Sequence, residues 1–154
     1  MDAEELFKKN LKKLQEDDVS ALNDFEQFHK SEMNIYDKIE FTHEFLDLLS
    51  FKLKQSKCPM NKDVLADYIL RLFTKTIDKY EYNHKFIASQ FKALVTYHKN
   101  NKNFDKAVEA LELLILHGII DDDAQRFHIQ LDELYRLRKK RWEKHTRAGG
   151  GNQG

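Results

Sequence analysis

The chain has 154 residues, of which 41% are hydrophobic and 34% are charged, and this length suits one ordinary domain with a single core. One proline and five glycines leave most of the chain free of helix breakers, which favours an all-helical protein over one built from strands. Basic and acidic side chains are equal in number, 26 of each, so the chain as a whole does not resemble a protein that binds mainly through phosphate contacts.

The charge is unevenly distributed along the chain. Residues 1–50 contain thirteen Asp or Glu and six Lys, a balance of −7. Residues 136–147 contain seven Lys or Arg and one Glu, a balance of +6. Any anion-binding role is therefore expected at the C-terminal end.

Apolar residues recur at helical spacing in seven segments of the chain. We expect helices over 2–16, 20–33, 37–55, 62–79, 83–99, 104–116 and 122–145. Ser20 and Asn61 are the expected N-caps of the second and fourth of these helices. Pro59 predicts a break between sub-bundles, and Gly118 is expected to end the sixth helix in a left-handed conformation.

The third and sixth expected helices are the most apolar. The segment 37–55 has a wide apolar face, formed by Phe41, Phe45, Leu46, Leu48, Leu49 and Leu53. The C-terminal half of 104–116 is apolar nearly all round, so neighbours must cover it on more than one side. By contrast, the seventh expected helix ends in arginines and lysines, whose positive charges interact favourably with the negative C-terminal end of the helix dipole.

These elements together predict an all-α fold. We expect about seven helices packed as successive antiparallel hairpins, in a short helical-repeat array like an α-solenoid. Residues 1–145 are expected to form a single domain, and the glycine-rich residues 146–154 a flexible C-terminal tail.

The stretch 91–122 carries the apolar pattern of a helical hairpin. The residues that form the pattern are Phe91, Leu94, Val95 and His98 on the first helix, Phe104, Ala107, Val108, Ala110, Leu111 and Leu114 on the second, and Gly118 and Ile119 at the close. This pattern resembles the pentatricopeptide repeat, a relative of the tetratricopeptide repeat. Lys102 stands where that family has a glycine in the turn, and Asp121 where it has a late proline.

The resemblance has an implication for RNA binding, because each hairpin of that family can read one RNA base through two side chains. The corresponding positions here are Lys92 and Asp122. A small amide or hydroxyl side chain is expected at the first of them. Lys92 is better interpreted as a solvated helix residue and Asp122 as an N-cap, so base-specific reading is not supported.

The basic C-terminal segment is a second candidate binding region, able to hold phosphates or an acidic partner surface. Its cations are Arg136, Arg138, Lys139, Lys140, Arg141 and Lys144. Trp142 among them is of a type that stacks on nucleobases. It also ends an apolar stripe through Phe127, Leu131, Leu134, Tyr135 and Arg138, and this spacing favours packing against a neighbour or a partner chain.

We find no motif for catalysis, for a cofactor or for a small-molecule substrate. None of the seven histidines forms a zinc-binding HExxH, and the single cysteine, Cys58, excludes an internal disulfide. There is no glycine-rich phosphate loop and no Ser-His-Asp signature. The longest apolar run is too short to insert into a membrane.

The sequence therefore predicts a non-enzymatic interaction or scaffold subunit of a larger protein assembly, which docks through helix faces and the basic C-terminal helix. The alternative is an RNA-associated protein of an organellar ribonucleoprotein. The N-terminus lacks the layout of a secretory signal, so we expect a cytoplasmic location, with a mitochondrion or another organelle as the alternative.

Overall fold

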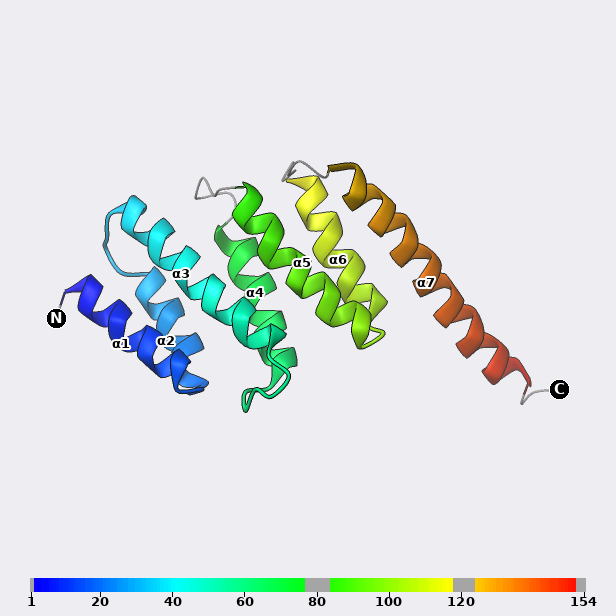
Figure 1. Cartoon of the computed structure of the whole chain (residues 1–154), viewed down its shortest axis with the longest axis horizontal. Helices are drawn as coiled ribbons and strands as arrows, with labels where there is room; N and C mark the ends of the chain where they lie inside the picture. The colour runs from blue at the N-terminus through cyan, green and yellow to red at the C-terminus, as the bar shows by residue number, and fades with distance from the viewer. Residues whose placement is uncertain (1, 77–83, 118–123, 152–154) are drawn as a thin grey trace. The chain divides into compact units, whose positions relative to one another are not determined.

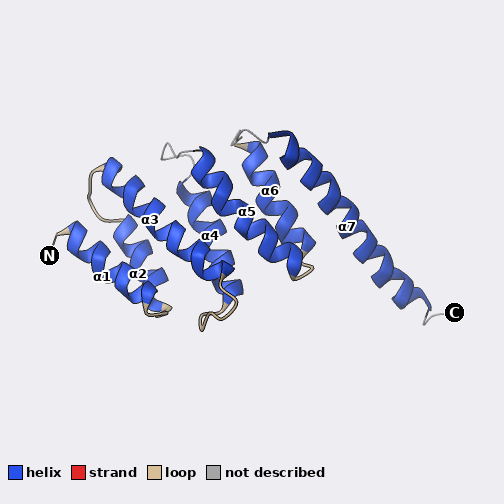
Figure 2. Ribbon diagram, viewed as in Figure 1, coloured by secondary structure: helices blue, strands red, loops and turns tan. Residues whose placement is uncertain are grey.

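The computed structural model describes residues 2–76, 84–117 and 124–151, and these residues form helices joined by turns (Figures 1 and 2). Over this part of the chain there are seven helices and no strand, so the predicted all-α class is confirmed. The helices are α1 (Ala3–Gln15), α2 (Ser20–His29), α3 (Ile35–Lys54), α4 (Lys62–Thr76), α5 (His84–Asn100), α6 (Phe104–Leu116) and α7 (Ala124–Gly151).

The helix ends follow local hydrogen bonding. Asn61 caps α4 as predicted, because its side-chain oxygen accepts the backbone N–H groups of Asp63 and Val64 at 2.9 and 3.3 Å. The prediction for Ser20 was wrong. Ser20 is the first residue of α2, and its backbone N–H donates to the Asp18 carboxylate at 2.9 Å. Gly118, the expected end of α6, lies outside the described residues.

Helix α7 is longer than expected, since it continues to Gly151 rather than ending near residue 145. None of the helices over the described residues combines the length and the apolar character needed to cross a bilayer.

The chain forms two compact units, residues 1–83 and 84–154. The first contains α1 to α4, and the second contains α5 to α7. Pro59 lies between α3 and α4, inside the first unit. The single domain over 1–145 and the solenoid-like array both stay predictions.

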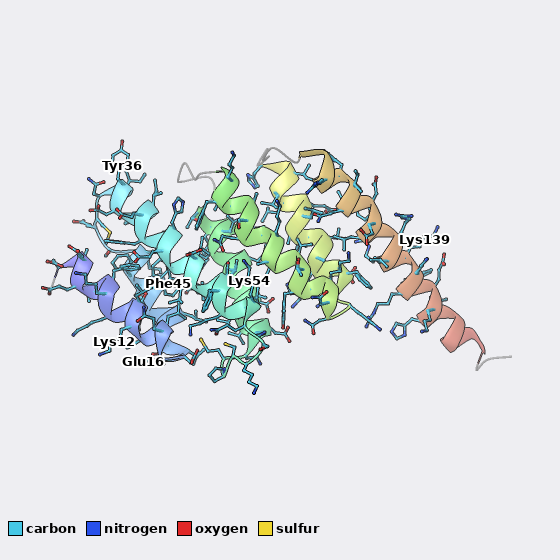
Figure 3. All side chains as sticks on the ribbon, in the orientation of Figure 1. Lys12, Glu16, Tyr36, Phe45, Lys54 and Lys139 are labelled. Atoms are coloured by element: carbon cyan, nitrogen blue, oxygen red, sulfur yellow. The ribbon has the colours of Figure 1, made fainter. Side chains whose placement is uncertain are left out.

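The core of the first unit is built from phenylalanines on α1, α2 and α3. The rings of Phe25 and Phe45 stack at 4.0 Å between centroids, and those of Phe7 and Phe41 stack at 4.4 Å. Phe45, labelled in Figure 3, is fully buried and lies on the face of α3 that the sequence predicts to be apolar. Such aromatic pairs contribute about 0.5–1.5 kcal/mol beyond the burial of their area.

A charged contact also ties the first unit together. The ammonium of Lys52 on α3 lies 2.6 Å from the carboxylate of Asp17, which is in the turn after α1. The Lys52 side chain is 7% exposed and that of Asp17 is 28% exposed. The ion pair therefore fastens the α1–α2 turn to a helix that lies 35 residues further along the chain.

The second unit has α6 in contact with both α5 and α7 (Figure 1). Ala107 and Ala110 on α6 are fully buried, and small side chains there allow close helix crossing. Leu134 from α7 is also buried. The expectation that α6 needs neighbours on two sides is confirmed, but its last residue, Leu116, is 78% exposed.

Candidate anion-binding groove

The turn between α5 and α6 has a left-handed residue at its centre. Lys102 adopts a φ of 59°, a conformation that glycine adopts without a steric cost. Its N–H donates to the Lys99 carbonyl at 3.0 Å, and the next N–H, of Asn103, donates to the His98 carbonyl at 2.8 Å. This is the Schellman arrangement, with lysine at the position usually held by glycine.

The repeat family that the stretch 91–122 resembles has a glycine at this point of the turn, and the left-handed conformation of Lys102 is one that suits glycine. A left-handed residue that carries a Cβ is strained by roughly 1–2 kcal/mol. The side chain of Lys102 is exposed and lines the groove described next.

A groove lies between this turn and the C-terminal half of α7. Its volume is about 890 Å³, and an adjoining hollow of about 510 Å³ shares the side chains of Lys102, Phe104, Arg141 and His145 with it. We call the two together the basic groove. Its lining comprises Asn101, Lys102, Asn103, Phe104, Asp105, Tyr135, Leu137, Arg138, Lys139, Lys140, Arg141, Trp142, Lys144 and His145.

The lining is strongly cationic. Six of its side chains are lysine or arginine, and Asp105 is the one carboxylate in the described lining. Asp105 lies 3.7 Å from the guanidinium of Arg138, a pair of partly exposed groups that contributes little energy in water. The groove therefore keeps a clear excess of positive charge, which favours an anionic ligand.

Two aromatic side chains of α7 line the groove in different states. The hydroxyl of Tyr135 donates to the Glu112 carboxylate, a hydrogen bond that raises the pKa of Tyr135, and the Arg138 guanidinium lies 5.2 Å from its ring centroid. Trp142 is 67% exposed. Tyr135 is thus held in place by its neighbours, whereas the indole of Trp142 is largely open to solvent.

The predicted packing stripe on α7 is only partly buried. Leu134 is 2% exposed, whereas Trp142, two turns further on, does not pack into this unit. The reason is that α7 extends past the α5–α6 turn, where α6 begins, as Figure 1 shows. Phe127, the first residue of the stripe, has a side chain outside the described part.

The structure brings together most of the predicted binding residues. Arg138, Lys139, Arg141 and Trp142 line the larger hollow, and Lys140, Arg141 and Lys144 line the smaller one. Figure 3 labels Lys139 on the C-terminal half of α7. Arg136 is exposed but is not part of the lining.

Of the two positions suggested by the repeat resemblance, only the first lies among the described residues. Lys92 is exposed on α5 and does not line the groove. Asp122 lies outside the described residues. Among the described residues, the groove therefore contains no position that the resemblance associates with base reading.

Sequence reasoning missed the second wall of the groove, formed by the residues 101–105. These residues lie more than thirty positions before Trp142, and no periodic pattern links the two segments. The one available signal was Lys102 itself, because a lysine at a glycine position places a cation on an exposed turn.

A hollow in the first unit differs in charge. Its volume is about 430 Å³, and its lining includes Glu26, His29 and Lys38. The Glu26 carboxylate lies 2.8 Å from the Arg71 guanidinium, and the Lys38 ammonium donates to the His29 carbonyl at 3.1 Å. The cations of its described lining are Lys30, Lys38 and Lys75, half the number in the basic groove. Because the contacts of Glu26 and Lys38 also lie within the unit, the basic groove is the better candidate site.

Over the described residues, no group of three or more His, Cys, Asp or Glu side chains is placed to hold a metal ion. Comparisons with protein-family models, with curated proteins and with solved structures find no significant match to this chain.

Proposed function

We propose that this chain is a non-enzymatic docking subunit of a larger protein assembly, and that the basic groove binds an acidic segment of a partner protein. The observation that carries the proposal is a described lining with six cations and a single carboxylate, in which four of the cations line the same hollow as the exposed indole of Trp142. Interfaces are enriched in tryptophan and arginine, and a few such residues supply most of the binding energy.

The energetics divide between the two kinds of side chain. Each exposed ion pair contributes about 0–1 kcal/mol and is weakened by salt, so the cations mainly attract and orient the partner. Burial of the Trp142 indole supplies the apolar contribution, at about 25 cal/mol per Å² of apolar surface. An acidic segment that also carries an apolar side chain can pair with the groove cations and cover the indole of Trp142.

Trp142 provides the direct test, because it is the only tryptophan in the chain. Poly-glutamate added at low salt is expected to shift the fluorescence of Trp142 to shorter wavelength, as the indole leaves water. About 0.5 M NaCl should reverse the shift, since it screens the exposed charges. Poly-lysine is the control ligand and should leave the emission unchanged.

Two variants locate the binding in the groove. Lys139→Glu/Arg141→Glu reverses two lining charges and should abolish the response to poly-glutamate. Lys9→Glu/Lys57→Glu makes the same change in net charge at exposed positions of the first unit and should leave the response intact. Equal loss in both variants would show general charge attraction and would contradict the proposal.

A second candidate function is binding of single-stranded RNA. The observation that favours it is the open indole of Trp142 in the same hollow as Arg138 and Arg141, because aromatic side chains in a cationic groove stack on bases. Oligouridylate that binds more tightly than poly-glutamate at the same salt concentration would support RNA in place of a protein partner.

A further inference from the structure

The exposed face of α3 is mainly acidic, opposite in charge to the basic groove. Its exposed side chains Asp37, Glu40 and Glu44 are acidic, Asp47 lies on the same face, and Lys54 at the end of the helix is the one exposed cation of α3. Two large aromatic residues flank them, Tyr36 at 76% exposure and Phe51 at 59%. We call Tyr36, Asp37, Glu40, Glu44 and Phe51 the α3 acidic stripe.

Helical geometry places these residues on one side of α3. Positions 36, 40, 44 and 51 fall within one narrow sector at 3.6 residues per turn. From Tyr36 to Phe51 the stripe is about 22 Å long, and the groove-lining part of α7, residues 135–145, is about 15 Å long. Figure 3 shows Tyr36 projecting away from the ribbon at the start of α3.

The stripe and the groove are complementary in chemistry. Carboxylates on one face match the lysines and arginines on the other, and each surface adds exposed aromatic side chains. The chain as a whole is neutral, with a pI near 7.1, so two copies meet without net repulsion at neutral pH. The acidic stripe of one chain is therefore expected to attract the basic groove of another chain.

We propose that the basic groove of one copy binds the α3 acidic stripe of a second copy. This inference rests on the proposed function of the groove and names its partner. In such a contact, Trp142 packs beside the exposed aromatic residues of α3, and the lysines and arginines of α7 face Glu40 and Glu44.

The contact is heterologous, because it joins two different surfaces. Each copy then keeps one unused groove or one unused stripe, so assembly continues until a ring closes or an open chain forms. The expected behaviour is an apparent mass that rises with protein concentration at low salt and returns to that of the monomer in about 0.5 M NaCl.

Sedimentation of the full chain and of charge-reversed variants tests the inference. Lys139→Glu/Arg141→Glu reverses two of the six groove cations, and Glu40→Lys/Glu44→Lys reverses two carboxylates of the stripe; each variant alone should remain monomeric. An equimolar mixture of the two should associate again, because the unchanged groove of the stripe variant can bind the unchanged stripe of the groove variant. Glu5→Lys/Glu16→Lys, at exposed positions on and just after α1, is the matched control and should assemble like the unchanged chain.

The outcomes separate this inference from the proposed function. If the unchanged chain stays monomeric at every concentration while poly-glutamate still shifts the Trp142 emission, the partner is not a second copy and the inference is overturned. If the emission does not respond to poly-glutamate either, the docking function of the groove fails as well. Circular dichroism of each variant confirms that its helices remain folded.

Discussion

Two turns of this protein have the same backbone geometry and use their charged residue differently. Asp17 after α1 and Lys102 after α5 both adopt left-handed conformations, with φ of 62° and 59°. Each is at the residue of a Schellman turn where glycine is usual: the N–H groups of Asp17 and Asp18 donate to the Leu14 and Lys13 carbonyls.

The difference lies in where the side chain goes. Asp17 forms a largely buried ion pair with Lys52 and stabilises the first unit. Lys102 is exposed, and over the described residues no ion pair involves it. In the first turn, the strained conformation of Asp17 is explained by an ion pair that stabilises the fold. In the second turn, Lys102 has no such pair among the described residues, and its place in the lining of the basic groove suggests a role in binding.

The largest expected effect concerns the Asp17 turn. Asp17→Gly relieves the strained conformation but leaves the ammonium of Lys52 buried without its partner, so the free energy of unfolding should fall by about 2–3 kcal/mol. Urea denaturation followed by circular dichroism measures this change. A variant as stable as the unchanged chain would contradict the stabilising role of the ion pair.

Removal of both charges sharpens that prediction. Lys52→Met in the Asp17→Gly background removes the unpaired ammonium and keeps an apolar side chain of similar length. It should restore at least half of the lost unfolding free energy, because the desolvation penalty of the buried charge disappears.

The next largest effect concerns binding. Trp142→Ala should leave the free energy of unfolding unchanged within about 0.5 kcal/mol, because the side chain is exposed. It should weaken binding of poly-glutamate about tenfold, as expected for a central tryptophan of an interface. Isothermal titration calorimetry measures this affinity without the fluorescent residue. Loss of stability with unchanged affinity would show a structural role instead.

The smallest effect is expected from the replacement of Lys102 by glycine in the second turn. Lys102→Gly should raise the free energy of unfolding by about 1 kcal/mol, since it relieves the left-handed strain and breaks no ion pair. It should also weaken poly-glutamate binding about twofold, through the loss of one exposed cation. If Lys102→Gly and Asp17→Gly change stability in the same direction, the contrast between the two turns is wrong.

Much of the fold could be predicted from local pattern. The seven helices follow from the 3.6-residue spacing of apolar side chains, and Asn61 is recognised as a cap because its side chain acts over three residues. Ser20 was misassigned because the helix begins at Ser20 itself, whose backbone N–H donates to the Asp18 carboxylate two residues earlier. Which of several neighbouring Asp and Ser residues precedes the first turn of a helix cannot be decided from sequence alone.

The candidate site could be predicted only on the α7 side. The cluster of lysines and arginines around Trp142 is visible in the sequence, because those residues are consecutive. Its other wall, around Lys102 and Phe104, depends on how α7 passes the α5–α6 turn. That approach, and the exposure of Trp142, are set by tertiary packing rather than by spacing along the chain.

The most direct test of the account is the fluorescence of Trp142 during titration with poly-glutamate at low salt. We predict a shift to shorter wavelength that about 0.5 M NaCl reverses and that Lys139→Glu/Arg141→Glu removes. An emission spectrum that stays constant through the titration, with the protein folded, would contradict the assignment of the groove as a docking site for acidic partners.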